Sequence, residues 1–123
     1  MGFFASSFAY FFIPKNVLTV SNQPNGTAIR ITRASLAKDG FVIMEKKDEA
    51  SELFTPLGES DLLQKGTYTN IHIKFMNRES SAKSGEQVYV TLYTDTGDKS
   101  YSSLDFPVRT LLGKPLRKRI RLY

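Results

Sequence analysis

The chain has no cysteine and no tryptophan, and it has a single histidine among its 123 residues. Without cysteine it forms no disulfide, offers no thiolate to a metal and has no thiol nucleophile. A blue-copper site is excluded as well, because it needs two histidines and a cysteine. His72 lies in the alternating stretch NIHIKF, on the same side as Asn70 and Lys74, so we interpret it as an exposed strand residue.

Acidic residues are missing from the C-terminal stretch GKPLRKRIRLY, which holds five of the seventeen basic residues. Residues 1–113 carry twelve basic and twelve acidic groups, so the net charge of +5 comes from this end alone. A nucleic-acid-binding domain usually spreads positive charge over a face of its body. The sequence therefore favours a neutral body that ends in a basic segment.

This basic end alternates as a β-strand does. One face holds Leu116, Ile120 and Leu122 together with Lys118, and the other holds Arg117, Arg119 and Arg121 together with Tyr123. We therefore predict a final strand whose apolar side chains are buried and whose arginines form an exposed row. The row is a candidate surface for an anionic partner, a nucleic acid included.

The first thirteen residues, MGFFASSFAYFFI, contain ten apolar residues and no charge. They are too few to span a bilayer, which takes about 20, and no basic region precedes them as in a signal peptide. Three interpretations stay open: the outer part of an export signal or membrane anchor, a segment that docks on another subunit, and a segment that packs on its own domain. The residues expected to make these contacts are Phe3, Phe4, Phe8, Phe11 and Phe12. We divide the chain into this apolar segment, residues 1–14, and one domain, residues 15–123.

From Val17 onward the dominant hydrophobic period is two, with Gly, Pro and Asp turns between seven or eight short runs. This pattern predicts an all-β, antiparallel sandwich. In TAIRITRASL, alternation places Arg33 on the same face as Ile29 and Ile31, and Ala34 on the opposite face. We interpret EKKDEASE, residues 45–52, as a solvated loop, and SDLLQKG, residues 60–66, as a turn of helix.

The tripeptide DTG at Asp95–Gly97 is also found in dimeric aspartic proteases, where two such carboxylates share a proton. Here Asp98 and Lys99 follow at once, whereas the protease loops need small residues. A hairpin turn explains the sequence, because Gly supplies the positive φ and Asp caps the turn. Asp95 and Asp98 are also candidate Ca²⁺ ligands, although calcium usually takes more than two carboxylates. We predict no catalytic residue, no cofactor and no small-molecule substrate.

Several motifs resemble an uncharacterised domain family of exported archaeal and bacterial proteins. In chain order they are Gly40-Phe41-Val42-Ile43, Leu57-Gly58-Glu59-Ser60, Leu62-Leu63, Gly66, Asn70 and Asp95-Thr96-Gly97-Asp98, within a similarity that covers roughly residues 17–122. The chain departs at Met44 and near Tyr93, where the family often has histidine, so no histidine site is carried over. The resemblance implies an immunoglobulin-like sandwich, often behind an N-terminal signal or anchor, and no known activity.

The sequence thus leads us to expect a non-enzymatic, extracytoplasmic β-sandwich module with a structural or binding role at the cell surface. The alternative is a self-assembling subunit of a fibre or surface layer, in which residues 1–13 dock on a neighbouring copy. The expected partners are a membrane or a second copy of the chain through residues 1–13, and an anionic surface through the arginine row.

Overall fold

A computed structural model describes residues 15–76, 86–95, 97, 106–109 and 113–123. This part of the chain contains eight strands and no helix. The strands are β1 (Val17–Thr19), β2 (Ala28–Leu36), β3 (Gly40–Lys47), β4 (Phe54–Glu59), β5 (Gly66–Lys74), β6 (Gln87–Thr94), β7 (Phe106–Pro107) and β8 (Arg117–Arg121). The expected apolar segment, residues 1–14, lies outside the described residues.

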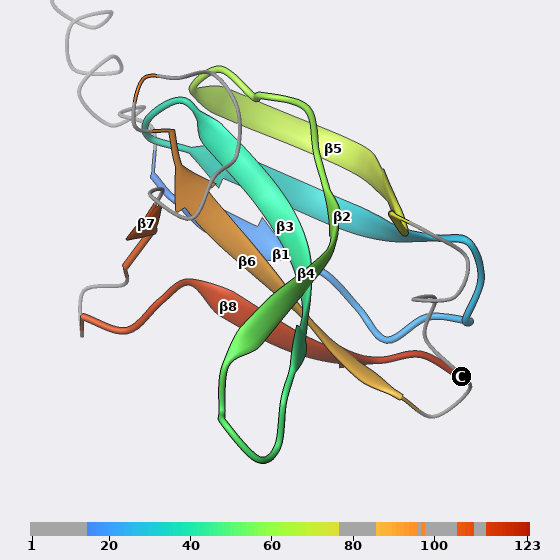
Figure 1. The fold of residues 1–123 in the computed structure, drawn as a ribbon. Coiled ribbons are helices and arrows are strands. Elements are labelled where there is room, and N and C mark those ends of the chain that lie inside the picture. The colour runs from blue at the N-terminus through green and yellow to red at the C-terminus, as the bar shows by residue number, and fades with distance from the viewer. Residues whose placement is uncertain (1–14, 77–85, 96, 98–105, 110–112) are drawn as a thin grey trace, which may run out of the picture.

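The strands form two facing antiparallel sheets (Figure 1). One sheet has the order β1-β2-β5, and the other has the order β4-β3-β6, with β7 and β8 both pairing with β6. Immunoglobulin-like sandwiches also put the first, second and fifth strands in one sheet and the third and the last two in the other. Here the fourth strand pairs with the third. The predicted antiparallel sandwich is confirmed.

Side chains that point between the two sheets form the main core. The fully or nearly buried members are Leu18, Ile29, Ile31, Ala34, Leu36, Val42, Met44, Leu57, Ile73, Val88, Val90, Leu92, Ile120 and Leu122. Burying a Val, Leu, Ile or Met side chain contributes about 1.5–3 kcal/mol, so this set is the main source of stability. Ile120 and Leu122 are buried and Leu116 packs against the core, which confirms the final strand.

The regular alternation predicted for β2 is wrong in its second half. Ile31 and Ala34 are both buried, whereas Arg33 is exposed. The change of face occurs where the ladder between β2 and β5 skips the pair Thr32 and Asn70. Asn70 has a φ of 54°, in the left-handed region that asparagine tolerates better than most residues. Arg33 therefore faces outward next to an irregular point in the pairing of β2 with β5.

The outer edge of β8 is tied to the segment that follows β1. Gln23 donates its N–H to the carbonyl of Arg121 (3.2 Å) and accepts from the N–H of Tyr123 (3.1 Å). The N–H of Arg121 donates to the side-chain oxygen of Asn22 (2.9 Å). The basic end of the chain is thus a strand that is held by β6 on one side and by the connection between β1 and β2 on the other, and we infer that it is not a flexible arm.

The stretch expected as a turn of helix is irregular and closes one end of the sandwich. Gly40 and Leu63 exchange backbone hydrogen bonds of 2.9 and 2.8 Å.

The described part of the chain holds no helix with the length and hydrophobicity that crossing a bilayer requires.

Candidate functional site

A buried carboxylate lies on the outer face of the larger sheet. Glu45 is on β3, on the same side as Phe41 and Ile43, and only 1% of its surface is exposed. It was expected in a solvated loop, so that prediction is wrong. Its carboxylate oxygens accept hydrogen bonds from the hydroxyls of Thr91 and Tyr93, the latter at 2.6 Å.

Arg117 completes this cluster from β8. Its Nε donates to the hydroxyl of Thr91 (2.8 Å), and one terminal nitrogen lies 3.3 Å from a carboxylate oxygen of Glu45. The guanidinium carbon lies 3.7 Å from the centre of the Phe54 ring, which meets Tyr89 edge to face. Only 18% of the Arg117 side chain is exposed, so its predicted membership of an exposed row is wrong.

The cluster joins four strands, because its members come from β3, β4, β6 and β8. Every buried side-chain nitrogen and oxygen in the described residues has a hydrogen-bond partner. Both oxygens of Glu45 are engaged, and the charge of Arg117 is matched by it. We therefore assign the cluster a structural role, in which it holds β8 against β6.

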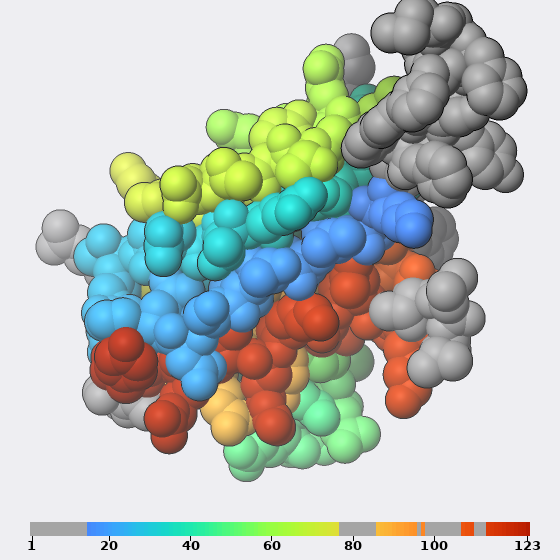
Figure 2. Space-filling model, turned by 180° about the vertical axis from the view of Figure 1, so that it is seen from behind, coloured from blue at the N-terminus to red at the C-terminus, as the bar shows by residue number. Residues whose placement is uncertain are grey.

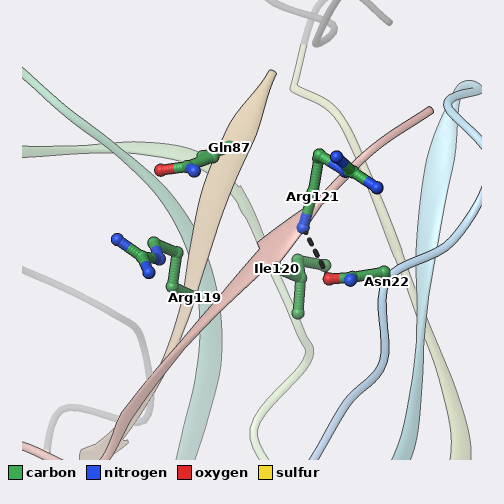
Figure 3. A pocket seen from close by; sticks show the side chains of 5 residues that line it. All are labelled: Asn22, Gln87, Arg119, Ile120 and Arg121. Atoms are coloured by element: carbon green, nitrogen blue, oxygen red, sulfur yellow. Dashed lines mark hydrogen bonds between the residues drawn. The ribbon is translucent and has the colours of Figure 1, made fainter. Parts of the chain in front are cut away.

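Arg119 and Arg121 are exposed, as predicted. Together with Asn22, Gln87 and Ile120 they line a hollow of about 430 Å³ beside β8 (Figure 3). Neither arginine forms an ion pair within the described residues. Figure 3 shows Arg119 extending from β8 on the side of Gln87, and Arg121 on the side of Asn22. The sequence alone did not identify the side chains of Asn22 and Gln87 as part of this site. Asn22 lies on a connection that only the fold brings next to β8.

The candidate calcium ligands are described only in part. Asp95 lies just after β6, where its side chain accepts from the N–H of Gly97 (3.2 Å), as in the predicted turn. Its own N–H donates to the carbonyl of Asp39 (2.9 Å). Asp98 lies outside the described residues. Within them, no three His, Asp or Glu side chains are grouped so that they could hold a metal ion.

Comparison with known proteins identifies the domain at the level of its family. Searches of the curated proteins and of the solved structures return no significant match to this chain. The family model described as a domain of unknown function, DUF7282, matches residues 16–118, from just before β1 into β8. This match covers most of the chain and agrees with the resemblance to an uncharacterised domain family. The chain therefore belongs to the DUF7282 family.

Proposed function

We propose that this domain is a non-enzymatic binding module that works outside the cytoplasm and holds an anionic group in the hollow beside β8. The observation that carries the proposal is the pair Arg119 and Arg121, two exposed guanidinium groups with no carboxylate partner in the described residues. Two such cations beside one hollow favour a ligand that supplies the missing negative charge.

The chemistry of the hollow supports a carboxylate or phosphate ligand. A guanidinium group presents planar, paired N–H donors that match the oxygens of either group. The carboxamides of Asn22 and Gln87 line the same hollow and add neutral hydrogen-bonding groups. The strand that carries the arginines is held on one side by Arg117 and Glu45 and on the other by Gln23. A rigid support of this kind reduces the ordering cost of binding.

A place outside the cytoplasm is supported by the sequence. The resemblance is to domains of exported proteins, and the apolar residues 1–13 suit a signal or anchor. Absence of cysteine is compatible with either compartment.

The test is calorimetric titration of the full chain with trigalacturonate, tripolyphosphate and neutral maltotriose. We expect binding of at least one anion, weakened by salt, and none of maltotriose. Arg119→Gln/Arg121→Gln should abolish it. Lys118→Gln is the control, because Lys118 is exposed on the same strand and does not line the hollow. Absence of binding to both anions, or equal losses in the double variant and the control, would refute the proposal.

A further inference from the structure

Positive and negative charges are separated along this chain in a way that the zero net charge of residues 1–113 hides. Three stretches, residues 15–38, 62–76 and 106–123, contain twelve of the seventeen basic residues and none of the twelve acidic ones. The fold brings them together, because they supply β1, β2, β5 and β8. Figure 2 shows β1, β2 and β5 side by side, with the C-terminal residues next to β1. The charges of the body sum to zero, as expected, but the positive charges are not spread evenly over it.

The outer face of the β1-β2-β5 sheet can be read row by row from the strand register. Arg33 lies between Thr19 of β1 and Thr69 of β5. Arg30 lies opposite His72, and its guanidinium donates to the side-chain oxygen of Asn70 (3.1 Å). All these side chains are exposed.

Lys74 extends this face by one more cation, diagonally across from Arg30. Arg30 and Arg33 are three residues apart on β2, which corresponds to about 10 Å along the strand. Neither arginine, nor Lys74, forms an ion pair within the described residues. The charges therefore form a line along the sheet and do not converge on one small anion.

We propose that this outer face of β1, β2 and β5 binds an extended acidic polysaccharide. Arg30, Arg33 and Lys74 would contact acidic groups spaced along the polymer. Threonine hydroxyls from all three strands would exchange hydrogen bonds with sugar hydroxyls, since a hydroxyl both donates and accepts. The site is separate from the hollow beside β8, and the inference does not depend on that hollow.

A nucleic acid fits this face less well than an acidic polysaccharide. Single strands are bound largely by stacking of bases on aromatic side chains. The described residues on the outer face of β1, β2 and β5 include no Phe, Tyr or Trp. The larger side chains of β5, Tyr68 and Ile71, pack against the core instead.

The experiment measures binding of the full chain to polygalacturonate, with neutral dextran and an oligothymidylate as comparison polymers. The test variant is Arg30→Gln/Arg33→Gln/Lys74→Gln. The matched control is Lys46→Gln/Lys47→Gln/Lys114→Gln, which removes the same charge from residues outside this face. Exposed substitutions of this kind change stability little, and thermal denaturation checks that both variants are folded.

We expect the wild-type chain to bind polygalacturonate and not dextran. The test variant should bind about tenfold more weakly or worse, and the control within about twofold of wild type. Tripolyphosphate is a small anion on which the charges of this face do not converge, so its binding at the hollow beside β8 should be unchanged in the test variant. Equal losses in the two triple variants, tighter binding of oligothymidylate than of polygalacturonate, or no binding of polygalacturonate would each overturn the proposal.

Discussion

Replacing Arg117 with leucine tests the buried cluster directly. The substitution leaves the carboxylate of Glu45 in place, 1% exposed, with only the hydroxyls of Thr91 and Tyr93 to stabilise its charge. A buried charge that loses its partner is strongly destabilising, typically by about 3–5 kcal/mol. Arg117→Leu should therefore destabilise the domain much more than the position of Arg117 near the end of the chain would suggest.

The magnitude follows from the contacts of the guanidinium group. Its hydrogen bonds to charged and polar partners contribute about 1.5–3 kcal/mol, and its contact with the Phe54 ring about 0.5–1 kcal/mol. Because 18% of the Arg117 side chain is exposed, water recovers part of the loss. We expect a decrease of about 3 kcal/mol in the free energy of unfolding, or about 10–15 °C in melting temperature for a domain of this size.

The assay is urea denaturation followed by circular dichroism, with Arg119→Leu as the control. Arg119 is an exposed neighbour on the same strand without an ion pair, so its replacement should cost less than about 0.5 kcal/mol. In Glu45→Leu/Arg117→Leu the loss should be smaller than the sum of the two single losses, because neither charge is left alone. A loss below about 1 kcal/mol for Arg117→Leu would show that the pair behaves as a surface ion pair, and the argument would be wrong.

Three further predictions concern the fold and the N-terminal segment. Gly40→Ala should unfold the domain or lower its melting temperature strongly, because the new methyl group would clash with the backbone carbonyl of Tyr93. Gly26→Ala is the control and should leave the melting temperature unchanged, because open space surrounds Gly26. Deleting residues 115–123 should abolish the cooperative thermal transition, since it removes Ile120 and Leu122 from the core, and an unchanged melting temperature would contradict the role of β8. A chain that starts at Lys15 should be a soluble, folded monomer by light scattering. The full chain should bind detergent or self-assemble, because ten of its first thirteen residues are apolar. A stable full-length monomer in plain buffer would rule out both the anchor and the assembly interpretation.

Alternation along the chain was sufficient to predict the strands and much of the core. Val88, Val90 and Leu92 point inward because a strand places every second side chain on the same face. The same rule correctly predicted that the basic end is a strand with Ile120 and Leu122 buried. These features depend on local geometry, which the order of residues determines directly.

The candidate sites depended on contacts between distant parts of the chain. Glu45 is buried because β8 brings Arg117 to it from 72 residues away, and sequence periodicity contains no information about that partner. A left-handed torsion at Asn70 accompanies the turn of Arg33 to the outside, and two acid-free strands become one cationic face only when β2 pairs with β5. The sequence by itself determined which side chains alternate. Only the tertiary structure decided which charges meet, because Coulomb energy depends on distance in space and not along the chain.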